Sequence, residues 1–155
     1  MENIWLLASA SCWDDILLQK SSLNQRFFPS TFRRTSLEKA KVDEVVDRLQ
    51  DAYNTLVIEP LWVTDLRKKE QLTKKNLEET LPRTMNDMEK LLTTRGEYMV
   101  SDHLTWADIQ VFYFCYEVRN MVDIGRWKNL DNLCKKVGDI PNIKKWVESR
   151  PVTDL

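Results

Sequence analysis

The stretch 104–116 constrains the fold of this chain more than any other part of the sequence. Thr105 and Asp108 have the spacing of a capping box, in which the hydroxyl and the carboxylate satisfy free backbone N–H groups at a helix start. Leu104 and Ile109 stand at the two positions of a hydrophobic staple around the same start. The rest of the stretch is apolar or aromatic on nearly every side. A helix of this kind is typical of a protein interior, so the sequence predicts a buried central helix.

Taken alone, the apolar run also fits a buried β-strand, because it is rich in aromatic and β-branched residues. The two start signals and the distance from Thr105 to Gly125 favour a helix. The whole chain contains only 3 Gly and 5 Pro, fewer than the many turns of a sheet-rich fold would need. We therefore expect other helices to pack around the central one.

A second capping box, Thr35 to Glu38, predicts the start of another helix. The apolar residues behind it recur with the spacing of a helix that buries one face. They are Val42, Val45, Val46, Leu49, Ala52, Tyr53 and Leu56. Because Pro60 has no N–H to donate, this helix is expected to end at 56–59. The alternative is that residues 61–63 continue it after a kink.

The middle of the chain predicts a second long helix. The basic segment 67–75 is interpreted as a solvated connection, and apolar residues then recur at helical spacing over 72–92. Pro82 lies inside this stretch, where it should kink the helix or begin a new turn. Gly96 is expected to end it.

Two shorter helices are predicted after Gly125. The first carries apolar residues over 130–137 and is closed by Gly138. The second begins at Pro141, a residue favoured in the first helical turn, and stops at Pro151. The sequence thus predicts an all-α bundle of five or six helices around a buried central helix.

The charge balance excludes several partners. With 23 basic and 24 acidic residues the net charge is -1, which argues against nucleic acid and against membrane surfaces as partners. No apolar run reaches the roughly 18 residues of a membrane span. The three cysteines, Cys12, Cys115 and Cys134, show no C-x-x-C spacing, which is typical of a reducing compartment. We expect a cytoplasmic protein.

Residues 1–36 are interpreted as an unassigned, poorly ordered N-terminal arm. The segment 4–10 resembles the apolar core of a signal peptide. However, the residues before it include the acidic Glu2 and no basic residue, which is the wrong charge for a signal peptide. The segment 24–34 mixes aromatic residues with arginines, as nucleic-acid stacking patches do. A single such stretch on a chain without net positive charge does not support that reading.

The most informative polar feature is a row of three aspartates, Asp43, Asp47 and Asp51, each four residues from the next. This spacing places them on one helix face, where like charges repel. The row is open to three readings: a solvated face, a surface for a partner subunit or a hard cation, or a carboxylate that holds the amine of a small ligand.

No other residue pattern points to catalysis. His103 is the only histidine and has no nucleophile spaced near it, so we interpret it as an exposed loop residue rather than part of a triad. The Gly-rich phosphate loops, zinc-protease motif and EF-hand motif are all absent from the sequence.

Three segments, 40–47, 101–108 and 140–153, follow one another as in a known family. They resemble the first helix, the capping segment and the last helix of the glutathione transferase C-terminal domain. The sigma class, which includes the haematopoietic prostaglandin D synthases, is the most similar. The resemblance covers residues 37–155 and implies the same helical bundle there.

The resemblance also implies roles for single residues. Asp51 matches an aspartate that reaches the amine of glutathione across the dimer interface. Tyr53 and Ile58 match positions that line the pocket for the hydrophobic substrate. Asp47 matches a carboxylate that helps bind a divalent cation between subunits, although Gln50 replaces another aspartate of that cation site. Thr105 and Asp108 match the family's capping box, which serves folding.

The family also has an N-terminal thioredoxin-like domain, which carries the tyrosine that activates the glutathione thiol. Residues 1–36 are too short for that domain and contain no tyrosine. The resemblance therefore implies a glutathione S-transferase-like protein with no catalytic residue of its own and no activity alone.

In this family, glutathione serves as co-substrate for conjugation of hydrophobic electrophiles or for isomerisation, and no cofactor is needed for folding. The expected partner is a second copy of the chain or a complete transferase subunit. The alternative is a non-catalytic dimerisation domain or a truncated gene product.

Overall fold

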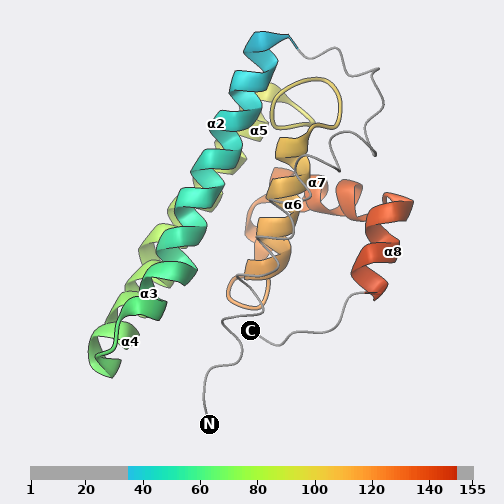
Figure 1. The fold of residues 1–155 in the computed structure, drawn as a ribbon. Coiled ribbons are helices and arrows are strands. Elements are labelled where there is room, and N and C mark those ends of the chain that lie inside the picture. Colours follow the sequence, from blue (N-terminus) through green and yellow to red (C-terminus); the bar gives the residue numbers. More distant parts are fainter. Residues whose placement is uncertain (1–34, 150–155) are drawn as a thin grey trace. The chain divides into compact units, whose positions relative to one another are not determined.

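The computed structural model describes residues 35–149, and its unit Ser36–Glu148 is a bundle of helical rods (Figure 1). The first rod joins α2 (Ser36–Tyr53), the π-helical turn η1 (Asn54–Ile58) and α3 (Glu59–Trp62). The second joins α4 (Leu66–Lys75), the π-helical turn η2 (Asn76–Thr80) and α5 (Leu81–Arg95). Single helices α6 (Trp106–Val118), α7 (Lys128–Gly138) and α8 (Pro141–Ser149) follow, with the short 3-10 turn η3 (Ile124–Arg126) before α7. The predicted all-α bundle is confirmed within the described residues.

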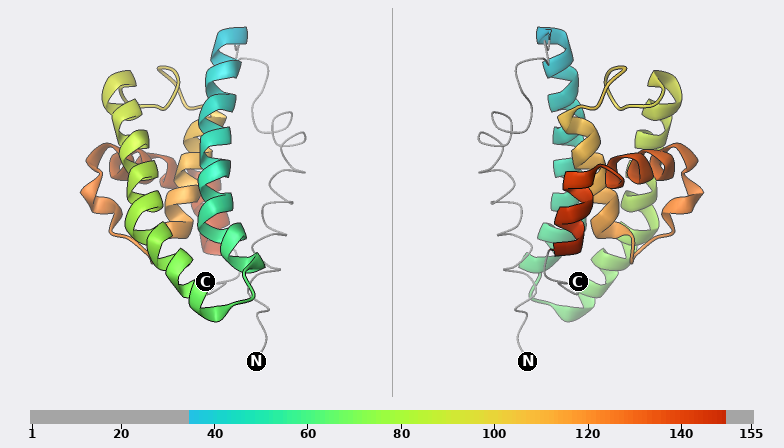
Figure 2. Two further views of the ribbon diagram at one scale, coloured as in Figure 1. Left: turned by 90° about the vertical axis from the view of Figure 1, so that its left-hand side faces the viewer. Right: turned by 90° about the vertical axis from the view of Figure 1, so that its right-hand side faces the viewer.

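Helix α6 lies at the centre of the bundle. It packs against α2 and against α7, and Figure 2 shows it beside the pair formed by α2 and α5. Ten of its 13 residues are buried, which is what an all-round apolar helix requires. The apolar stripe predicted for the first helix also faces this core, since six of its seven residues are buried: Val42, Val45, Val46, Leu49, Ala52 and Tyr53. The seventh, Leu56, lies in η1 and is half-buried.

The predicted capping box at the start of α6 is formed. The Asp108 carboxylate is fully buried and accepts the N–H and the hydroxyl of Thr105, each at 2.7 Å, on Oδ2. Its other oxygen accepts the N–H of Met99 at 2.7 Å, which ties the preceding loop to the helix start. One carboxylate thus satisfies three buried donors from two segments of the chain.

The first rod does not end before Pro60; it continues to Trp62, which is the alternative that the sequence left open. The chain widens into the π turn η1, in which the N–H of Glu59 bonds to the carbonyl of Asn54 five residues back. Pro60 then occupies the first turn of α3, where a missing N–H is tolerated. The second rod repeats this arrangement, with Leu81 bonded to Asn76 before Pro82.

Asn76 joins the two π turns. In η1, the N–H of Glu59 is engaged with Asn54 and Pro60 has none, so the carbonyl of Thr55 has no helical donor left. The side chain of Asn76, which is 3% exposed, donates to that carbonyl at 2.6 Å. This bond satisfies the acceptor that the proline leaves open, and it fixes η1 against η2.

The basic segment 67–75 is also not a connection, because it forms most of α4. The Asp65 side chain begins this helix by accepting the N–H groups of Arg67 and Lys68 at 3.0 and 3.3 Å. None of its ten residues is fully buried, and only one of its half-buried residues, Leu72, is apolar, so the apolar stripe that identifies most helices is missing here. Gly96, at φ 108°, ends α5 as predicted.

The N-terminus of α7 is capped by a side chain from another helix. Glu89 of α5 accepts the N–H of Asn129 at 3.0 Å on one oxygen and the N–H of Leu130 at 2.9 Å on the other. A negative charge at this end also complements the helix dipole. The Trp127 indole adds a third tie to α5 by donating to Asn86 at 2.8 Å.

Replacing Glu89 by alanine should lower the free energy of unfolding by about 2 kcal/mol, since both capping bonds and the dipole contact are lost together. Glu89→Gln keeps one acceptor and should cost about half as much. Urea denaturation measures both values, with Glu70→Gln on the exposed face of α4 as the matched control. Equal stability of Glu89→Ala and the control would contradict a capping role.

Two sets of predictions lie outside the described residues. These are the N-terminal arm with its signal-like and aromatic segments in residues 1–34, and the helix stop at Pro151. Within residues 35–149, none of the helices combines the length and the apolar character needed to cross a membrane.

Candidate functional site

A groove of about 670 Å³ lies between the two composite rods and holds the main candidate residue. Asp51, Ala52 and Thr55 line it from the first rod, and Thr84 and Met88 from α5. Its remaining charged lining residues are Arg48, Lys75, Glu79, Arg83 and Asp87. Acidic and basic groups therefore face the same space, which suits a ligand that carries both charges.

Asp51 is exposed at the wall of this groove. Within residues 35–149 its carboxylate forms no ion pair and accepts no side-chain hydrogen bond, whereas the neighbouring Arg48 is engaged with Glu44 at 2.8 Å. An exposed carboxylate with no partner of its own can accept hydrogen bonds from an ammonium group.

The other two aspartates of the row are separated from the groove. Asp43 and Asp47 are exposed on α2, and neither is among the groove's lining residues. Residues 35–149 contain no group of three histidine, cysteine, aspartate or glutamate side chains placed to hold a metal ion. The cation site at Asp47 stays a prediction that involves a second subunit.

Tyr53 and Ile58 do not meet Asp51. Tyr53 is 5% exposed and belongs to the core face of α2, and Ile58 is half-buried in η1. Neither lines the groove that contains Asp51. Their predicted role in a hydrophobic substrate pocket stays a prediction.

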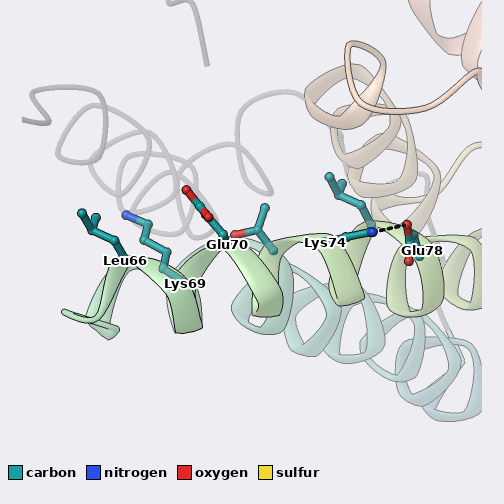
Figure 3. Close-up of a pocket in the computed structure, with 7 residues that line it drawn as sticks. Leu66, Lys69, Glu70, Lys74 and Glu78 are labelled. Atoms are coloured by element: carbon teal, nitrogen blue, oxygen red, sulfur yellow. Dashed lines mark ion pairs between the residues drawn. The ribbon is translucent and has the colours of Figure 1, made fainter.

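A second hollow, of about 450 Å³, lies on the face of α4 and η2 (Figure 3). Its lining residues are Leu66, Lys69, Glu70, Thr73, Lys74, Leu77 and Glu78. All come from one helical face, where Lys74 and Glu78 pair at 3.9 Å. The residues lie along the helix rather than around a common centre, so this hollow lacks the converging polar groups of a ligand site.

His103 is not simply an exposed loop residue, which corrects the sequence interpretation. Its Nε2 lies 3.1 Å from Glu38 at the start of α2, and its Nδ1 lies 3.0 Å from Asp102. The hydrogen bond from His103 lowers the pKa of the Asp102 carboxyl. The histidine ties the loop before α6 to α2, a contact between distant segments that the sequence does not reveal.

Sequence reasoning also missed the basic side of the groove. Lys75 and Arg83 lie on either side of the π turn η2 and face Asp51 across the groove only because the two rods lie side by side. The one local signal is the repeated spacing from Asn54 to Pro60 and from Asn76 to Pro82, which gives both rods the same interruption.

Comparisons with known proteins give one consistent result. The family described as "Glutathione S-transferase, C-terminal domain" matches residues 51–150. Mouse hematopoietic prostaglandin D synthase is 31% identical over 127 residues, which cover 79% of this chain and 60% of the mouse protein. Glutathione S-transferase 1 of Ascaris suum is 27% identical over 148 residues, or 90% of this chain and 72% of the worm protein.

The structural comparison agrees. A solved structure of rat hPGDS in complex with a quinoline is similar with a TM-score of 0.75 and 26% identity, over 90% of this chain and 68% of that one. The chain spans about 60% of the length of the curated prostaglandin D synthases that it matches.

Proposed function

The chain belongs to the glutathione S-transferase family through its C-terminal domain, and we propose that it acts as the helical part of a glutathione-dependent transferase. In that reaction the glutathione thiolate attacks a hydrophobic electrophile, or adds and leaves again in an isomerisation. The observation that carries this proposal is the free carboxylate of Asp51 in a groove of mixed charge between α2 and α5.

Asp51 is proposed to hold the amine of a glutathione molecule that is bound mainly by a neighbouring subunit. An ammonium group and a carboxylate form a charge-assisted hydrogen bond, which orients the tripeptide without taking part in the chemistry. The basic residues on the opposite wall, Lys75 and Arg83, suit the carboxylates of the same ligand. Tyr53 and Ile58 are proposed to face the electrophile.

Within residues 35–149, no tyrosine lines the groove, and a tyrosine hydroxyl is the group that would be expected to activate the glutathione thiol. A hydroxyl near the sulfur is needed to favour the thiolate at neutral pH. The four tyrosines are Tyr53, Tyr98, Tyr113 and Tyr116, and none of them lines the groove. Tyr98 is covered instead by the ammonium of Lys136, 4.3 Å from its ring centre. We therefore propose that the 155-residue chain by itself is inactive.

The purified chain should pass through a glutathione resin and leave a chlorodinitrobenzene electrophile unreacted above the uncatalysed rate. A single exposed charge contact is worth about 1 kcal/mol, too little to hold the tripeptide alone. Retention together with turnover that Asp51→Asn abolishes would contradict the proposed inactivity.

The positive test places this chain in a hybrid dimer with a complete sigma-type subunit. Asp51→Asn should raise the KM for glutathione roughly fivefold with little change in kcat, as expected for a lost binding contact of about 1 kcal/mol. Asp43→Asn, two turns away on the same helix face, is the matched control and should leave KM unchanged. Equal KM values for the two variants would remove Asp51 from the site.

The second candidate function is a non-catalytic dimerisation domain, which the exposed acidic row of α2 favours. Asp43 and Asp47 repel one another on a single chain and gain from basic groups of a partner subunit. Sedimentation that shows dimers without any glutathione-dependent activity in the hybrid would support this function. A cytoplasmic location fits the family and is part of the same proposal.

A further inference from the structure

Helices α6 and α7 approach each other closely at one glycine. A Cβ atom added to Gly138 of α7 would lie 3.2 Å from Cε2 of Phe112 on α6, so the backbone of α7 sits directly against that ring. Cys134 precedes Gly138 by one turn on the same face of α7, and Cys115 follows Phe112 by about one turn on the same face of α6. The close approach at Gly138 therefore also brings the two cysteines together.

The two thiols meet where the helices pack. Both are free, and they lie close enough to each other for Cys134 to influence the Cys115 thiol. Cys115 is 3% exposed, whereas Cys134 is half-buried. The hydrogen bond to Cys134, burial and the charge of Asp131 raise the pKa of the Cys115 thiol. Cys134 is therefore the thiol that meets a reagent first.

We propose that Cys115 and Cys134 are a dithiol pair that closes reversibly into a disulfide between α6 and α7 when the chain meets a disulfide oxidant of the glutathione disulfide type. Helices α6 and α7 pack against each other, and each cysteine lies about one turn from the close approach of Gly138 to Phe112. A disulfide there would join the two helices covalently. The inference does not depend on the proposed transferase function, because here glutathione disulfide acts as an oxidant from solution.

The exchange balances in two steps. The Cys134 thiolate attacks one sulfur of glutathione disulfide, the S–S bond breaks, and one glutathione leaves as thiolate. Cys115 then gives up its proton and attacks the Cys134 sulfur, and the second glutathione leaves. The two cysteines lose two electrons and two protons, and the oxidant becomes two glutathione molecules. Excess reduced thiol reverses both steps.

The experiment oxidises the full 155-residue chain carrying Cys12→Ser with glutathione disulfide and maps the products by mass spectrometry. Trypsin places Cys115 in peptide 96–119 and Cys134 in peptide 129–135, so the cross-linked pair is a single defined product. We expect this product, without added glutathione mass, and its disappearance on treatment with dithiothreitol.

Three variants sharpen the test. Cys115→Ala should stop the reaction at a glutathione adduct on Cys134, since the resolving thiol is missing. Gly138→Ala should slow cross-linking several-fold, because the added methyl group pushes α7 away from Phe112. Asn132→Ala, on the exposed face of α7, is the matched control and should cross-link at the rate of the parent chain.

Two outcomes would overturn the proposal. One is a glutathione adduct that persists on Cys134 while Cys115 stays reduced in the folded chain. The other is a pair of thiols that both remain reduced under conditions that oxidise free cysteine. A Gly138→Ala rate equal to that of Asn132→Ala would show that helix approach does not control the reaction.

Discussion

Replacing Asp108 by alanine is expected to lower the free energy of unfolding by about 3–5 kcal/mol, a large part of the stability of a domain of this size. The carboxylate is fully buried and is the acceptor for three donors, the N–H and hydroxyl of Thr105 and the N–H of Met99. Alanine leaves all three without a partner at the start of the central helix. Urea denaturation followed by circular dichroism measures the loss.

Three milder variants separate the contacts. Asp108→Asn has one carbonyl oxygen, so it can satisfy either Met99 or Thr105 but not both, and it should cost less than alanine. Thr105→Ser keeps the hydroxyl and should cost least, whereas Thr105→Ala removes one bond and should cost about 1–2 kcal/mol. If all four variants were equally stable, the capping box would not contribute to stability.

The stability difference between the wild-type chain and Asp108→Asn should depend on pH. Burial raises the pKa of the Asp108 carboxyl, although its hydrogen bonds act in the opposite direction. The folded chain therefore holds this proton more tightly than the unfolded chain does. The contribution of Asp108 is full below the usual carboxyl pKa and is partly lost as pH rises through the raised value. Denaturation at several pH values should show that the stability difference between the wild-type chain and Asp108→Asn becomes smaller as the pH rises. A difference that grows with pH would contradict the raised pKa.

Asn76→Asp is expected to cost about 3 kcal/mol or more at neutral pH, the second largest effect. The substitution keeps the shape of the side chain but replaces the donor with a negative oxygen, which would then face the carbonyl of Thr55 at the position of the present 2.6 Å bond. The site is buried, so water cannot screen the repulsion. Thermal and urea denaturation measure the effect.

Acid provides an internal check on this variant. Once protonated, the introduced carboxyl can donate its O–H to Thr55, so the stability lost in Asn76→Asp should be partly recovered as pH falls. Asn76→Ala lacks both donor and charge, and should cost about 1–3 kcal/mol without this recovery. Asn54→Asp is the matched control, because Asn54 holds the same place in η1 but is exposed. Equal losses at the two asparagines would exclude a special role for the Asn76 bond.

The parts of the fold that follow from local rules could be predicted. The capping box needs only Thr105 and Asp108 at the right spacing, and the buried face of α2 needs only apolar residues at helical intervals. Both were confirmed because neighbouring residues on one helix determine them. The third donor to Asp108 is the N–H of Met99. This is a contact between the loop and the helix, and the spacing of residues within the helix does not predict it.

The full length of the two helical rods could not be predicted, because proline and charged residues usually indicate a helix end or a connection. Pro60 indicates a helix end, yet the π turn before it changes the hydrogen-bond register and lets the rod continue. The charged residues of α4 gave no apolar stripe that predicts a helix, although Asp65 was an available cap signal. The groove around Asp51 depends on the packing of two rods, which no single segment encodes.

The paired π turns also restrict how the length of this chain can change. A π turn holds one residue more than an α turn, so each rod carries an extra residue at the same distance before its proline, six residues from Asn54 to Pro60 and from Asn76 to Pro82. Loss of that residue from one rod alone would rotate every later side chain of the rod by about 100° relative to the earlier ones. Asn76 would then no longer reach Thr55, and Arg83 would turn away from the groove. Deletions at the π turns are therefore compatible with this architecture only when both rods lose a residue together. We expect the lengths of the two rods to vary in a coupled way.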